Sequence, residues 1–63
     1  MNNKVKIVRV SKDLQQKDLA LKVGISRQTL SLIEKGQYNP SLKLCVSIAE
    51  ALDSDLNSLF WKV

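Results

Sequence analysis

The sequence contains no histidine, one cysteine, one proline and two glycines in 63 residues. Without histidine or a second cysteine, the chain has neither a typical zinc site nor an internal disulfide, which are the usual reinforcements of so small a domain. We therefore expect no cofactor and no metal, so helix packing or dimerisation must supply the stability. Cys45 lies between Leu44 and Val46, and we expect it to be a buried structural thiol rather than a nucleophile.

The sequence also lacks the features of membrane proteins, secreted proteins and enzymes. No apolar run reaches the roughly 18 residues of a membrane span, and the N-terminal residues do not begin a secretion signal. We expect a cytoplasmic protein with no membrane partner and a single domain over residues 1–63. Paired carboxylates at useful spacing and a glycine-rich phosphate loop are missing, which argues against an enzyme. No small-molecule ligand is evident at this length.

Positive charge is concentrated in the first two thirds of the chain. Residues 1–43 carry nine Lys or Arg side chains and three carboxylates, a net charge of +6, whereas residues 44–63 have a net charge of −2. One part of the molecule should therefore attract polyanions while another should not. A solvated basic surface would show the same imbalance, so charge alone does not decide whether the chain binds nucleic acid.

Sparse helix-terminating residues divide the chain into five segments. The boundaries are Gly24, Gly36, Pro40 and the Asp53-Ser54-Asp55 cluster. The first segment contains β-branched residues that suit a strand as well as a helix, and we predict a helix. The sequence thus predicts an all-α fold. Its five segments run from about Asn3 to Lys12, Gln16 to Val23, Ser26 to Gly36, Pro40 to Leu52 and Asp55 to Trp61.

The second and third segments have the spacing of a tight corner between two helices. Gly24 suits a left-handed residue that ends one helix, and Ser26 has the side chain of an N-cap for the next. Because only Ile25 separates them, the two helices cannot lie antiparallel. The pattern predicts a helix-turn-helix whose second helix is presented outward. Side chains of suitable size are available to fill the corner: Ala20, Leu30 and Ile33.

The last third of the chain supplies much of the apolar surface. In the fourth segment one continuous apolar face is expected from Leu42, Cys45, Ile48, Ala49 and Leu52. Beyond it, Asp55 is expected to cap a final turn whose apolar side chains either close the core or contact a second subunit, because so short a chain can hardly bury them all. Short extended pieces at Val5, Ile7 and Trp61-Lys62-Val63 could add to a dimer edge. The candidate dimer-interface residues are Leu52, Leu56, Leu59, Phe60 and Trp61.

Three stretches of the chain resemble the Cro/CI-type helix-turn-helix family, also known as lambda-repressor-like or XRE. They are Leu14 to Ala20, Gly24 to Leu30 and Ile33 to Ser41, and the likeness covers residues 5 to 60. It is strongest to short, stand-alone bacterial regulators without a separate ligand domain. The resemblance implies a five-helix lambda-repressor-like DNA-binding bundle. It also implies a homodimeric transcription regulator, a repressor, that binds a near-palindromic operator in double-stranded DNA through the major groove.

The resemblance places DNA contacts on the helix-turn-helix and on the loop after it. Gln16 matches a residue that grips a phosphate together with its helix N-terminus, where free N–H groups favour an anion. Gln28 can pair with adenine, and Arg27 with guanine or a phosphate. For Tyr38, packing against the bundle is an equally supported interpretation. The full set of expected contacts is Gln16, Lys17, Ser26, Arg27, Gln28, Thr29, Ser31, Leu32, Lys35, Gln37, Tyr38 and Asn39.

Two further features follow from comparison with the family pattern. Arg9 and Glu34 match a partly buried salt bridge between the first and third helices, so we assign them a structural role. The chain departs from the pattern at Gln15, a poor N-cap, at Asp53, where glycine is frequent, and at Leu32, where a polar residue is usual. Leu32 could contact thymine methyl groups. It also supports the alternative of a protein-binding module, such as an antitoxin.

Overall fold

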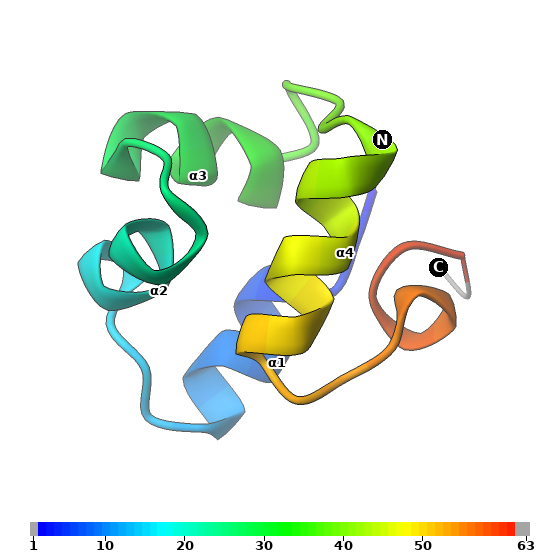
Figure 1. Cartoon of the computed structure of the whole chain (residues 1–63), viewed down its shortest axis with the longest axis horizontal. Coiled ribbons are helices and arrows are strands. Elements are labelled where there is room, and N and C mark those ends of the chain that lie inside the picture. Colours follow the sequence, from blue (N-terminus) through cyan, green and yellow to red (C-terminus); the bar gives the residue numbers. More distant parts are fainter. Residues whose placement is uncertain (1, 62–63) are drawn as a thin grey trace.

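The structure is a computed structural model that describes residues 2–61. It contains α1 (Val5–Ser11), α2 (Gln16–Val23), α3 (Arg27–Glu34), α4 (Leu42–Ala51) and a final wide helical turn, η1 (Asn57–Trp61), and no strand among the described residues. In Figure 1, α2 and α3 lie on one side of α4 and η1 lies on the other, with α1 below. The expected all-α arrangement of five helical segments is confirmed.

The first segment, for which the sequence allowed helix or strand, is helical from Val5 to Ser11. Val5 is fully buried and Val8 packs against the core, whereas Ile7 and Val10 are exposed. The suggestion that Val5 and Ile7 form extended edges of a dimer is therefore wrong, since both lie within α1. In the C-terminal piece proposed for the same role, Trp61 ends η1, and Lys62 and Val63 lie outside the described residues.

The corner between α2 and α3 has the geometry that the sequence predicts. Gly24 adopts a left-handed conformation with φ of 79°, and its N–H donates to the Ala20 carbonyl at 3.0 Å. The Ile25 N–H donates to the same carbonyl at 3.0 Å, so the last turn of α2 is closed by two backbone bonds. Ser26 then caps α3, because its Oγ accepts the Thr29 N–H at 3.0 Å. Gln15 makes no side-chain cap for α2, as expected from its side chain.

The other helix ends use short polar side chains in the same way. Ser41 Oγ accepts the Leu44 N–H at the start of α4, and Asp55 Oδ1 accepts the Ser58 N–H before η1. Asp53 has a φ of 52°, a left-handed conformation that agrees with the frequent glycine of the Cro/CI-type pattern at this position. Asp13 does the same after α1, with a φ of 56°, which the sequence analysis did not anticipate.

The core is shared by all five helical segments, with α4 at its centre. Its buried side chains include residues expected from the α2–α3 corner and from α4, which are Ala20, Leu30, Ile33, Cys45, Ile48 and Ala49. Leu19 of α2 is buried with them. Leu42 departs from the expected inward face of α4, because it lies in the first turn of the helix and is 64% exposed. Val46, one turn later, is also exposed. Only the remainder of the predicted α4 face therefore belongs to the core.

The C-terminal apolar cluster lies mostly in the core, which is one of the two alternatives that the sequence left open. Leu52 and Leu59 are fully buried and Phe60 is 3% exposed. They pack in the common core, and the N-terminal segment contacts η1 through the Lys4 N–H, which donates to the Leu59 carbonyl at 2.8 Å. From the candidate interface set, free surface remains on half-buried Leu56 and on Trp61, which is 58% exposed.

We predict that Leu59→Ala lowers the free energy of unfolding by about 2–5 kcal/mol, because it leaves a cavity in the core. Val10→Ala should change the free energy of unfolding by less than about 1 kcal/mol, since that side chain is 55% exposed on α1. Urea unfolding followed by circular dichroism measures both. Equal losses in the two variants would contradict the assignment of Leu59 to the core.

Candidate nucleic-acid interface

The outward face of α3 gathers six of the residues that the sequence predicts to contact DNA. They line one shallow groove: Gln16, Arg27, Gln28, Ser31, Leu32 and Lys35. On the opposite side of the same helix, Leu30 and Ile33 are fully buried. Because α3 is amphipathic in this way, packing alone fixes which of its side chains meet the solvent. Arg27 and Gln28, at its first turn, are exposed.

Two expected contact residues use their hydroxyl groups within the cap of α3. Besides accepting the Thr29 N–H, Ser26 Oγ donates to Thr29 Oγ1 at 2.9 Å. Thr29 is half-buried and Ser26 is exposed. The hydroxyl groups therefore stabilise the start of α3, and the Thr29 methyl group is the part of these side chains that is left for contact with a base.

A buried ion pair fixes α3 against α1. Arg9 Nε donates to Glu34 Oε2 at 2.8 Å and Arg9 Nη2 donates to Glu34 Oε1 at 3.3 Å. The side chains are 10% and 3% exposed, respectively, and Arg9 Nη1 also donates to the Leu14 carbonyl at 2.7 Å. The predicted salt bridge is thus confirmed, with the two-pronged geometry that arginine and carboxylate prefer.

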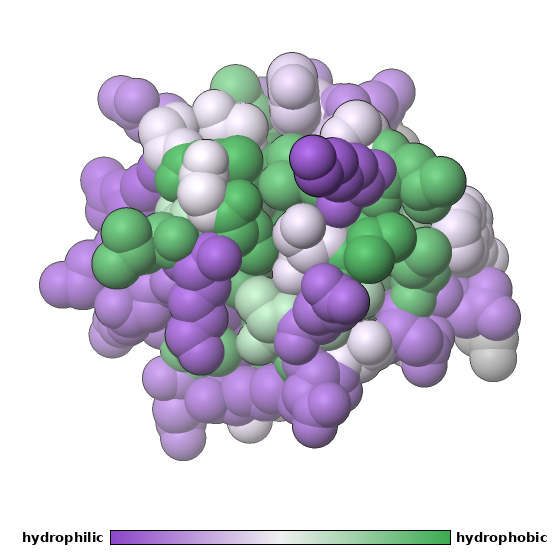
Figure 2. All heavy atoms as spheres, viewed as in Figure 1, coloured by the Kyte–Doolittle hydropathy of each residue, from purple (hydrophilic) through white to green (hydrophobic). Residues whose placement is uncertain are grey.

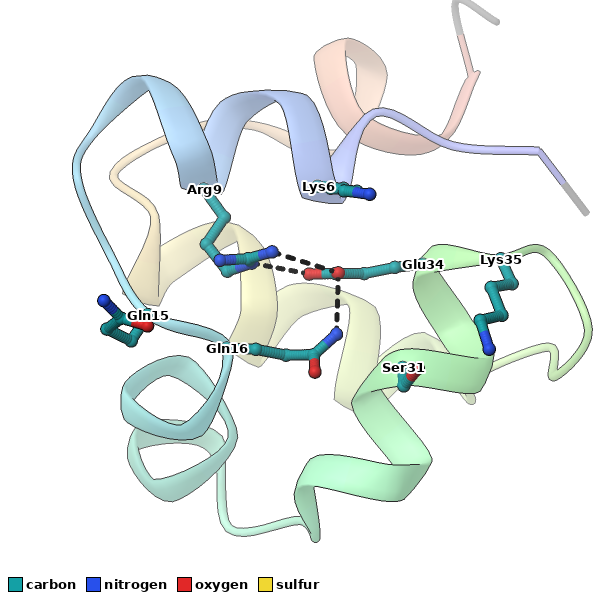
Figure 3. A pocket seen from close by; sticks show the side chains of 7 residues that line it. All are labelled: Lys6, Arg9, Gln15, Gln16, Ser31, Glu34 and Lys35. Carbon is teal, nitrogen blue, oxygen red and sulfur yellow. Dashed lines mark hydrogen bonds and ion pairs between the residues drawn. The ribbon is translucent and has the colours of Figure 1, made fainter.

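The same carboxylate also binds Gln16, which the sequence analysis did not foresee. Gln16 Nε2 donates to Glu34 Oε1 at 3.0 Å, and Figure 3 shows the amide oxygen turned away from Glu34. The amide that was expected to donate to a phosphate is thus engaged inside the molecule. Gln16 joins the first turn of α2 to the Arg9–Glu34 pair, so we call these three side chains the brace. The brace connects α1, α2 and α3.

The brace borders a second groove, which continues the first. Its lining, labelled in Figure 3, is Lys6, Arg9, Gln15, Gln16, Ser31, Glu34 and Lys35. Gln16, Ser31 and Lys35 line both grooves. Lys6 was not among the expected contacts. It precedes Arg9 by three residues on α1, so helical spacing would have placed the two side chains on one face.

The remaining expected contacts lie outside both grooves. Lys17 is exposed in the first turn of α2. Gln37, Tyr38 and Asn39 are exposed in the loop between α3 and α4, after Gly36, whose φ is 75°. Tyr38 is 47% exposed, so its surface is divided between the protein and the solvent.

Asn3 is a further positioning residue that the sequence analysis missed. Its Nδ2 donates to the Ile33 carbonyl at 2.8 Å, and its Oδ1 accepts the Val5 N–H at 3.0 Å. One side chain therefore joins the start of α1 to the last turn of α3. An asparagine in a polar N-terminal stretch gives no sequence signal for a contact 30 residues away.

Cys45 is a buried thiol on α4. Burial raises the pKa of the Cys45 thiol, and the side chain is 7% exposed, so the expected buried structural thiol is confirmed. Within residues 2–61, no three His, Cys, Asp or Glu side chains gather in a group that could hold a metal ion. No described helix has the length and apolar character to cross a bilayer.

A family model described as Helix-turn-helix matches residues 5–59. The chain belongs to this family of DNA-binding transcriptional regulators, which are not enzymes. An uncharacterized HTH-type transcriptional regulator of Methanocaldococcus jannaschii is 48% identical over 60 residues, which are 95% of this chain and 91% of the relative. YgzD of Bacillus subtilis, also an uncharacterized HTH-type transcriptional regulator, is 43% identical over 97% of this chain and 92% of its own length.

A solved structure shares the fold. The restriction-modification controller protein C.AhdI from Aeromonas hydrophila superposes with a TM-score of 0.85 at 35% identity, covering 90% of this chain and 86% of that chain. The Cro/CI-type resemblance and the lambda-repressor-like bundle are therefore confirmed.

We predict that Glu34→Ala lowers the free energy of unfolding by about 3 kcal/mol, because it leaves the Arg9 guanidinium buried without its carboxylate. Glu50→Ala is the matched control, since Glu50 is exposed on α4 and its loss should change the free energy of unfolding by less than about 0.5 kcal/mol. Thermal and urea unfolding measure both. A Glu34 variant as stable as the Glu50 variant would show that the brace does not hold α3.

Proposed function

We propose that this chain is a transcriptional repressor that binds a near-palindromic operator in double-stranded DNA as a homodimer. In this proposal residues 1–63 act as one DNA-binding domain in the cytoplasm, and α3 enters the major groove. The observation that carries the proposal is the exposed face of α3, where Arg27, Gln28 and Ser31 share one groove above a buried apolar side.

Base recognition is assigned to the first turns of α3. A glutamine can form two hydrogen bonds with adenine, and an arginine can form two with guanine. Gln28 and Arg27 are exposed and do not take part in the cap or the brace, so both can serve this purpose. Leu32, 41% exposed on the next turn, is suited to a thymine methyl group.

Backbone contacts are assigned to the N-terminus of α2 and to nearby cations. Gln15 gives α2 no side-chain cap, which leaves the first N–H groups of the helix for a phosphate oxygen. Lys17 is exposed next to Gln16 in the first turn of α2, and Lys35 is exposed in the grooves that Gln16 also lines. Contacts of this kind fix the register on DNA without reading sequence. They also make affinity depend on salt, with a slope of about −0.9 for each phosphate neutralised.

The dimer is proposed from dimensions and from the remaining exposed apolar residues. The chain measures 25 × 22 × 19 Å, so two copies side by side can present two α3 helices about 34 Å apart, which is one turn of DNA. Trp61 and Leu56 are the proposed interface residues that retain free surface, and Leu42 and Val46 on α4 are also exposed. A dimer bound across a promoter would exclude polymerase by occupancy.

The test is to select bound duplexes from a random pool. We expect an inverted repeat with half-sites about one helical turn apart. A selected sequence without internal symmetry would contradict the homodimer, and recovery of no preferred sequence would contradict specific DNA binding. A salt-independent interaction with a partner protein would instead support the protein-binding alternative.

Gln28→Ala should weaken binding to the selected operator by about 1–3 kcal/mol through loss of preference at one base pair per half-site. Lys35→Gln should weaken binding to operator and scrambled duplex alike, because a phosphate contact carries no sequence information. Fluorescence anisotropy with operator, single base-pair variants and scrambled DNA measures these affinities. If Gln28→Ala leaves the affinities for operator and for scrambled DNA unchanged, α3 is not the helix that reads the bases.

A further inference from the structure

Lys6 is a cation on the proposed DNA-binding side of the molecule that no role described above uses. It is exposed on α1 and lines the groove beside the brace. Figure 3 shows Lys6 and Lys35 on different elements of that groove, α1 and the end of α3. The groove is continuous with the one along α3, since Gln16, Ser31 and Lys35 line both. A DNA backbone beside α3 would therefore pass close to α1.

The charges in this groove favour an anion. Glu34 is the carboxylate in its lining, and Arg9 neutralises it through two hydrogen bonds while Gln16 occupies one of its oxygens. The Glu34 side chain is only 3% exposed. Among residues 2–61, the Arg9–Glu34 pair is the one ion pair within 4.0 Å, so Lys6 and Lys35 have no acidic partner there. The two ammonium groups leave the groove positively charged.

A phosphate in the groove would also meet neutral hydrogen-bond donors. The Ser31 hydroxyl lies in the lining, and the uncapped first turn of α2 begins at Gln16. A helix N-terminus by itself is a weak anion site. Two lysines from separate elements together with these donors form a setting in which one phosphodiester can be held from several sides.

We propose that Lys6 and Lys35 together bind one phosphate of the DNA backbone in the groove above the brace. The proposal rests on the proposed function and extends it by adding α1 to the DNA-contacting elements. The brace then has two effects: it fixes α3, and it removes the charge of Glu34 from the floor of the phosphate site. The ligand is the phosphodiester group, so the contact carries no sequence preference.

The test is the salt dependence of binding to a duplex of about 30 base pairs with arbitrary sequence. Lys6→Gln alone should lower the magnitude of the slope of log K against log[KCl] in part, and replacing Lys6 and Lys35 together by Gln should lower it by about 0.9 for each bound subunit. At 0.1 M KCl this corresponds to roughly eightfold weaker binding per subunit. Lys12→Gln is the matched control, because it removes the same charge from the end of α1 and does not line either groove.

The variants separate this inference from the proposed function. Lys6→Arg should keep the slope of the original chain, since it keeps the charge, and circular dichroism should show equal folding in all variants. If Lys6→Gln and Lys12→Gln lower the slope equally, general charge explains the effect and the site is refuted. An unchanged slope in Lys6→Gln refutes it as well. If the unmodified chain binds no duplex at any salt concentration, the proposed function itself fails.

Discussion

The Arg9 side chain joins α1 to the end of α3 and to the segment before α2. Its guanidinium donates to Glu34 at the end of α3 and to the Leu14 carbonyl before α2. Glu34 in turn accepts a hydrogen bond from the Gln16 amide in the first turn of α2. Because the Arg9–Glu34 pair is largely buried, moving α3 away from α1 would leave a buried charge without its partner. The apolar side of α3 sets its rotation, and the brace sets its placement relative to α1 and α2.

The corner between α2 and α3 was predictable because its determinants are local. A left-handed Gly24, a cap at Ser26 and a single residue between them limit the chain to few conformations, and the structure adopts the expected one. The buried side of α3 followed from the spacing of Leu30 and Ile33. The exposed residues of the candidate site on α3 were therefore predictable as well, because they lie on the opposite side of the helix. The Arg9–Glu34 pair followed only from resemblance to the family.

Features that depend on packing between distant segments were not predictable from the sequence. Apolar side chains such as Leu59 and Phe60 have the same pattern whether they close a core or meet a second subunit, and only the folded chain shows them in the core. The orientation of the Gln16 amide depends on a carboxylate 18 residues away. Asn3 reaches the end of α3 for a similar reason. In each case the sequence fixes the chemistry of the side chain but not its partner.

The central claim is that the brace presents the outer side of α3, with Arg27, Gln28 and Ser31, as the DNA-binding surface. Titration of the isotopically labelled chain with its selected duplex, followed by amide and side-chain NMR shifts, tests this most directly. We expect the largest chemical-shift changes on α3 and the first turn of α2, and small changes on α4 and η1. Shifts centred on α4 and η1, with α3 unaffected, would contradict the central claim.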